Sequence, residues 1–185
     1  MATECLEDVA GVDTEPERRR MMWSACLHES AHAVSARVLL KKTVKAMMFS
    51  DGTGVASVGG GVPASFKEAM VAAAGIMGDV LALRCPPPEK VSATPAEIAD
   101  PQTAQRVLAV HGKIMTDRVA VAQWCILDRE SQPRTWAQRH EWVFSSARAF
   151  VKEHCQEIVE VATALFGRGI ITLPAQPEEE TEHVD

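Results

Sequence analysis

The chain has 185 residues and a net charge of −6, with 46% hydrophobic and 24% charged residues. This length predicts a single domain whose hydrophobic core needs no disulfide bond or structural metal ion. The acidic net charge argues against nucleic acid as a partner, because polyphosphates bind basic surfaces.

The chain ends and the cysteines indicate the compartment. The first twenty residues lack the apolar stretch of a signal peptide, and no apolar run approaches the roughly 18 residues of a membrane span. The five cysteines are scattered, without a C-x-x-C pair, as is typical of reduced thiols. We therefore expect a soluble cytoplasmic protein without a membrane partner. Its expected organisation is a flexible segment at 1–14, a domain at 15–175 and a flexible acidic tail at 176–185.

Hydrophobic periodicity and turn signals predict a mostly helical α+β domain with one small β-sheet or hairpin. The first helix is expected from Pro16 to about Leu40, with apolar side chains on several of its faces. Two short strands at 44–49 and 54–58 are expected to flank the hairpin signal Asp51-Gly52. Further helices are expected at 65–83, at 101–111, within 113–128, and as one long helix from Trp136 to about Leu165.

Within the first helix, the stretch HESAHA places His28 and His32 four residues apart, with Glu29 between them. Positions i and i+4 lie on one helix face about 6 Å apart, so that two imidazoles can bind one zinc ion. Glu29 lies about 100° around the helix from His28, within reach of a zinc-bound water. A carboxylate in that place can act as the general base for peptide hydrolysis.

The same residues also fit a plain helix that carries two partly exposed histidines and an unrelated glutamate. The apolar neighbours Cys26, Leu27 and Ala31 argue against that interpretation, because polar groups on an apolar helix need partners. A catalytic zinc site has three protein ligands, so one further ligand must come from elsewhere in the chain.

The motif and its surroundings resemble the peptidase domain of the FtsH-family ATP-dependent zinc metalloproteases. HESAHA is similar to the family's H-E-A-G-H-A, with Ala31 in place of glycine, and VKAMMFSDGTGVASV is similar to its short β region. AAGIMGDVLAL is loosely similar to its GGRAAEE helix, with Gly75 kept and Asp79 in place of the acidic pair. The C-terminal AFVKEHCQEIVEVATALFGRGIITLPAQ resembles the family's last helix and close. The resemblance covers about residues 18–176 and implies a zincin-like metallopeptidase fold.

The resemblance also implies a third zinc ligand, which in this family is an aspartate at a helix start well downstream of the histidines. The corresponding stretch is PAEIADPQTAQRVLAVHG, which puts Asp100 in that place, with Glu97 and then Asp79 as alternatives. Asp100 followed by Pro101 is also typical of a simple helix N-cap. The sequence does not separate these two roles.

The sequence thus predicts a zinc-dependent metalloendopeptidase in which His28, His32 and Asp100 bind zinc and Glu29 is the general base for a zinc-activated water. The expected substrate is an extended polypeptide that adds to an edge strand of the small sheet. No G-x-x-x-x-G-K-[ST] loop of an ATPase occurs, so a separate unfoldase or adaptor protein is a possible partner. The alternative is a catalytically inactive binding or regulatory module of the same fold, and the oligomeric state is not indicated.

Overall fold

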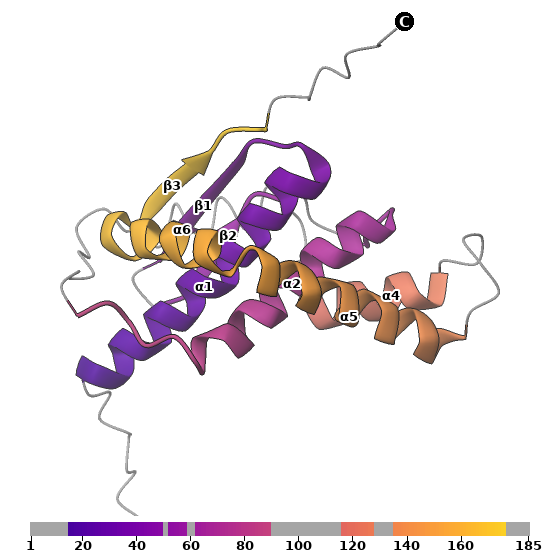
Figure 1. The fold of residues 1–185 in the computed structure, drawn as a ribbon, viewed down its shortest axis with the longest axis horizontal. Coiled ribbons are helices and arrows are strands. Elements are labelled where there is room, and N and C mark those ends of the chain that lie inside the picture. Colours follow the sequence, from indigo (N-terminus) through magenta and orange to yellow (C-terminus); the bar gives the residue numbers. More distant parts are fainter. Residues whose placement is uncertain (1–14, 50–51, 59–61, 90–115, 128–134, 177–185) are drawn as a thin grey trace, which may run out of the picture.

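The computed structural model describes residues 15–49, 52–58, 62–89, 116–127 and 135–176. In this part the fold is mostly helical with a small three-stranded antiparallel sheet (Figure 1), which confirms the predicted mostly α, α+β class. The elements in chain order are α1 (Glu15–Leu40), β1 (Val44–Met48), β2 (Gly54–Ala56), α2 (Phe66–Ala82), α4 (Asp117–Leu127), α5 (Trp136–Glu153), α6 (Cys155–Arg168) and β3 (Ile170–Leu173). The helix predicted at 101–111 lies outside the described residues. Among the described helices, none combines the length and the apolar character needed to cross a bilayer.

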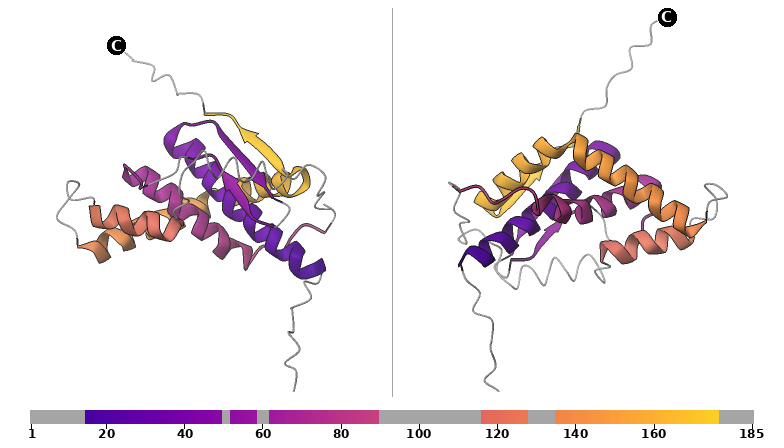
Figure 2. Two further views of the ribbon diagram at one scale, coloured as in Figure 1. Left: turned by 180° about the vertical axis from the view of Figure 1, so that it is seen from behind. Right: turned by 60° about the horizontal axis from the view of Figure 1, so that its bottom comes forward.

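Helix α1 forms the centre of the hydrophobic core and contacts α2, α6, β1 and β2. Its residues 29–36 are all buried, as the apolar side chains on several of its faces predict. Figures 1 and 2 show α1 crossing the molecule diagonally, with α6 and the sheet against it. Near its start, the Trp23 indole donates a hydrogen bond of 2.6 Å to the carbonyl oxygen of Cys85 and packs edge-on against Phe166. These contacts fix α1 to α6 and to the segment that follows α2.

Helices α1 and α2 run antiparallel and approach each other closely because two glycines of α2 face α1. Ser65 begins α2 as its N-cap, where its side chain accepts a hydrogen bond from the Glu68 amide. Further along, a Cβ atom at Gly78 would lie 2.6 Å from the carbonyl oxygen of Leu27. Only a residue without a side chain therefore allows the two backbones this separation.

The sheet has the strand order β2-β1-β3, and both pairs are antiparallel. The β1–β2 hairpin was predicted, and its turn contains Gly52 at a φ of 84°, a left-handed conformation that suits glycine. Ala46 lies opposite Ala56 on one side and Ile171 on the other. The sequence analysis missed β3, which has only four residues and follows directly after a helix end.

The prediction of one long helix after Trp136 is wrong, because the chain bends at His154 and divides into α5 and α6. The hydrogen-bond pattern continues across the bend: the His154 amide donates to the Phe150 carbonyl, and the Ile158 amide donates to the His154 carbonyl. The apolar periodicity continues as well, which is why the sequence reads as one helix. The bend lets α5 pack on α2 while α6 packs on α1.

Helix α4 packs with α2 and α5 around a second cluster of buried side chains. This cluster includes Ala69, Ala73, Val121, Cys125 and Val143. The predicted helix within 113–128 is thus confirmed, with its first residue at Asp117. Since α2 contacts both α1 and α4, it brings the start of α4 beside the middle of α1.

The close approach of α1 and α2 predicts that Gly78→Ala destabilises the protein. The added methyl group meets backbone atoms that cannot rotate away, so overpacking of about 1–3 kcal/mol should exceed the gain of about 1 kcal/mol in helix propensity. Thermal unfolding measures the change, and Val80→Ala, at an exposed position of the same helix, serves as the control. A Gly78→Ala protein more stable than the wild type would show that a methyl group fits between α1 and α2.

Candidate metal centre

Three ligand atoms from two helices converge on one point. The Nε2 atoms of His28 and His32, on α1, lie 3.1 Å apart. The Oδ2 atom of Asp117, at the start of α4, lies 2.9 Å from the first and 3.1 Å from the second. In a tetrahedral zinc site with bonds of about 2.0–2.2 Å, neighbouring ligand atoms are about 3.3 Å apart. The triangle of ligand atoms therefore has nearly the size that a zinc ion requires.

The other ring nitrogens determine how the two imidazoles are protonated. Nδ1 of His28 lies 3.1 Å from a carboxylate oxygen of Asp79, and Nδ1 of His32 lies 2.8 Å from the carbonyl oxygen of Val71. Both of these oxygens are acceptors, so each Nδ1 carries the proton and donates. In the neutral rings both Nε2 atoms are then acceptors that face each other and a carboxylate. Such a convergence is held together either by protons on the imidazoles or by a bound cation.

The pKa shifts of His28, His32 and Asp117 also indicate a site that favours bound positive charge. Burial lowers the pKa of His28, but hydrogen bonds with Asp117 and Asp79 raise it to about 10. Burial likewise lowers the pKa of His32, and Asp117 reverses this into a net rise. Burial disfavours the ionised form of Asp117, yet the two imidazoles hold its pKa well below its usual range. The raised histidine pKa values favour positive charge in the site, and the lowered pKa of Asp117 favours its anion; a divalent cation can supply that positive charge in place of protons.

Gly75 of α2 makes room for the histidine pair. A Cβ atom there would lie 2.2 Å from Nε2 of His32 and 2.9 Å from Nε2 of His28. Any side chain at this position would thus occupy the space beside the convergent nitrogens. The geometry of the site therefore requires glycine at position 75, in the stretch AAGIMGDVLAL.

Glu29 follows His28 directly and is buried, with 8% of its surface exposed. Burial raises the pKa of its carboxyl group, and the neighbouring histidines oppose that rise. The Ala56 amide of β2 donates a hydrogen bond to the carboxylate. A Cβ atom at Gly54 would lie 2.6 Å from Cγ of Glu29, so β2 passes directly over this side chain. Glu29 is therefore held between the helix and the edge of the sheet.

The structure brings together three of the residues predicted from the sequence, His28, Glu29 and His32. It adds Asp117, which was not predicted. His28 and His32 meet as predicted, and Glu29 lies beside them, off the ligand direction. Asp79, the last alternative for the third ligand, instead contacts the far nitrogen of His28. Asp100 and Glu97 lie outside the described residues, so their roles stay predictions.

Asp117 is the residue that sequence reasoning missed. It lies 85 positions from His32 along the chain. The available signal was the pair Thr116-Asp117 one residue before the apolar run VAVAQWCIL, since an aspartate at a helix start is where the resemblance places the third ligand. Two aspartates of the chain fit that description, and the sequence analysis selected Asp100.

Comparisons of the chain with protein-family models, with curated proteins and with solved structures find no match. The resemblance to the FtsH family therefore stays a prediction. The chemistry of the site is interpreted from its own residues.

The geometry predicts a graded loss of zinc affinity in three aspartate variants. Asp117→Ala removes a ligand atom and should weaken zinc binding by more than about 100-fold. Asp79→Asn removes the anionic partner of His28 Nδ1 and should weaken zinc binding by roughly 10- to 100-fold, as is usual for a group that orients a ligand. Asp100→Ala should bind zinc as the wild type does. Competition with a chromogenic chelator measures all three affinities, and circular dichroism checks that each variant is folded.

The same series can reverse the assignment. If Asp100→Ala loses zinc and Asp117→Ala keeps full zinc affinity, then Asp100 is the third ligand. Asp117 would in that case only stabilise the start of α4.

Proposed function

We propose that the protein is a zinc-dependent metallopeptidase, with His28, His32 and Asp117 as zinc ligands and Glu29 as the general base. The observation that carries this proposal is the convergence of three acceptor atoms beside a buried carboxylate with a raised pKa. A site that only binds metal has no use for such a carboxylate. The resemblance of HESAHA and its flanking elements to the FtsH-family peptidases supports the same zincin-like interpretation.

Zinc bound at this site would polarise the carbonyl group of a peptide bond and lower the pKa of a water molecule. Glu29 would take the proton from the water as it attacks the peptide carbonyl, and would then give it to the nitrogen of the leaving amine. Between the two steps the carboxyl group would hold the proton. The hydrogen bond from the Ala56 amide keeps the carboxylate in position meanwhile.

The outer edge of β2, with which no strand of the described residues pairs, is the proposed binding site for the substrate backbone. The Ser57 amide donates to the Lys45 carbonyl and the Phe49 amide to the Thr53 carbonyl, so residues 53 and 57 face β1. Since neighbouring residues in a strand face opposite ways, the backbone groups of Gly54 and Ala56 face away from β1. An extended peptide could pair with the amide and carbonyl groups of Gly54, since the Ala56 amide bonds to Glu29 and the Ala56 carbonyl accepts from the Val58 amide. Its scissile bond would then lie near Glu29.

The proposed mechanism predicts that Glu29→Gln keeps zinc but loses peptide hydrolysis. Glutamine preserves the shape of the side chain and cannot accept a proton, so the rate should fall by at least about 100-fold, as expected for loss of a general base. Cleavage of an unfolded protein substrate, assayed with the zinc content of the same sample, measures both properties.

Glu153→Gln, the same substitution at an exposed site at the end of α5, is the matched control and should leave the rate unchanged. Full activity in Glu29→Gln would exclude Glu29 as the base. If the wild-type protein binds zinc and cleaves no unfolded substrate, the inactive binding module becomes the better interpretation.

The binding mode predicts a local change in hydrogen exchange when a peptide hydroxamate inhibitor is added. The Gly54 amide should become protected, because it faces away from β1 and would pair with the inhibitor backbone, whereas the Ala56 amide already bonds to Glu29. The amides of β3, at the opposite edge of the sheet, should exchange as before and serve as the internal control. If the inhibitor binds without changing exchange in β2, the substrate lies elsewhere.

A further inference from the structure

The outer edge of β2 is short, because backbone hydrogen bonds turn the chain at both of its ends. At the start, the Phe49 amide donates to the Thr53 carbonyl, with a bond of 2.7 Å that closes the hairpin turn. At the end, the Val58 amide donates to the Ala56 carbonyl two residues back, as in a γ-turn. The edge that an extended peptide can approach is therefore limited to the three residues of the strand.

Of these three residues, one has both of its backbone groups unpaired. Val55 turns its backbone groups toward β1. The Ala56 amide donates to the Glu29 carboxylate, and the Ala56 carbonyl accepts from the Val58 amide. In the part of the chain that the structure describes, neither the amide nor the carbonyl of Gly54 has a hydrogen-bond partner. Gly54 is therefore the one residue of β2 that can pair fully with a peptide.

Gly54 also lies beside the proposed base. A Cβ atom on Gly54 would lie 2.6 Å from Cγ of Glu29, and Glu29 follows the proposed ligand His28 in α1. A peptide that pairs with Gly54 would lie about 4.8 Å from β2, the usual distance between neighbouring strands. The peptide residue opposite Gly54 is therefore close to the bond that is cut.

We propose that Gly54 determines substrate specificity, because it alone on β2 binds the substrate backbone, at one residue beside the cleaved bond. This role rests on the proposed peptidase function. The substrate residue must donate its amide hydrogen to the Gly54 carbonyl, which proline cannot do. At its other positions the substrate forms no backbone pair with β2, so proline is accepted there. The substrate class is short flexible segments of varied sequence, with a residue other than proline at one position.

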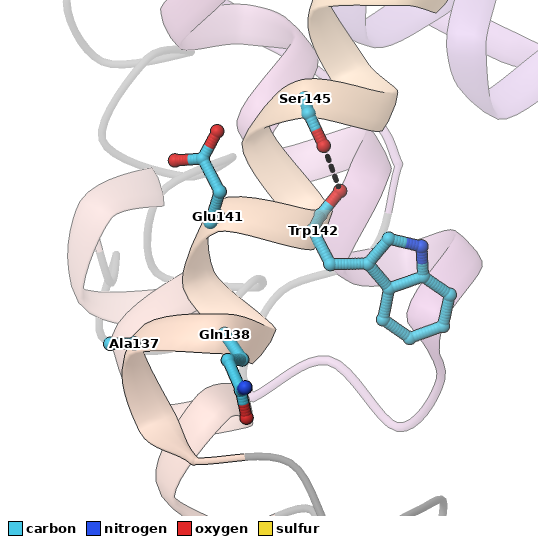
Figure 3. A pocket seen from close by; sticks show the side chains of 5 residues that line it. All are labelled: Ala137, Gln138, Glu141, Trp142 and Ser145. Atoms are coloured by element: carbon cyan, nitrogen blue, oxygen red, sulfur yellow. Dashed lines mark hydrogen bonds between the residues drawn. The ribbon is translucent and has the colours of Figure 1, made fainter.

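A hollow on α5 is the alternative place for a peptide. It has a volume of about 450 Å³ and is lined by Ala137, Gln138, Glu141, Trp142 and Ser145. Figure 3 shows that all of these residues belong to one helix, where the Ser145 hydroxyl donates to the Trp142 carbonyl over a distance of 3.1 Å. None of them belongs to the metal centre. The backbone of a helix is also paired internally, so the hollow has no edge that could bind a peptide backbone.

The test is a scan of peptide hydroxamates that bind the zinc-loaded protein. Two series of alanine hexapeptides carry the hydroxamate at either end, so that both sides of the metal are sampled. Each member has one methylated amide nitrogen, which removes one hydrogen-bond donor. Methylation at one position should weaken binding by about tenfold, and at every other position by less than about twofold. Competition with a fluorescent unmethylated hydroxamate measures the affinities.

Ser145→Trp, which fills the hollow on α5, is the control variant and should bind every hydroxamate as the wild type does. Weaker binding by this variant would place the peptide on α5 and overturn the role of Gly54.

The pattern of sensitive amides can also overturn it. Two sensitive amides, two positions apart, would show that the peptide pairs along an extended edge, and no sensitive amide would show that it does not pair with Gly54. In both cases the unmethylated hydroxamate still binds, so the zinc site itself stands. A wild-type protein that binds zinc but no hydroxamate would overturn the proposed peptidase function together with the role of Gly54.

Discussion

The arrangement of the molecule depends on bringing three acceptor atoms to one point and holding them there. His28 and His32 reach that point from α1, and Asp117 reaches it from α4. Helix α2 makes the convergence possible, because it packs against both other helices. Its glycines at 75 and 78 remove the side chains that would separate it from α1. The packing of α2 on α1 and the proposed metal site therefore both require glycine at these positions of α2.

The sheet contributes to the site through one strand. Among the described strands β2 lies at an edge of the sheet, donates a backbone hydrogen bond to Glu29 and turns the backbone groups of Gly54 away from β1. The side chain that is proposed to move the proton is therefore fixed by the same strand that is proposed to bind the substrate. Any displacement of β2 would affect positioning of the base and substrate binding together.

Local signals in the sequence were enough for most elements and for the histidine pair. Apolar periodicity identified α1 and α2, and Asp51-Gly52 identified the hairpin, because these features depend on residues close together in the chain. The pairing of His28 with His32 also depends only on residues close together in the chain, because they are four positions apart on one helix. The bend at His154 could not be read from the sequence, since the apolar repeat and the hydrogen bonds both continue through it. Asp117 was missed because its place beside the histidines depends on how α4 packs on α2, a contact between distant segments.

The most direct measurement is the zinc content per chain, by elemental analysis of protein purified without a metal-affinity tag. Three acceptors converging on one point predict close to one zinc ion per chain, and His32→Ala should lose it. Protein that contains no zinc after purification, and takes up none when zinc is supplied, would contradict the account. The convergence of His28, His32 and Asp117 would then have to be held together by protons alone.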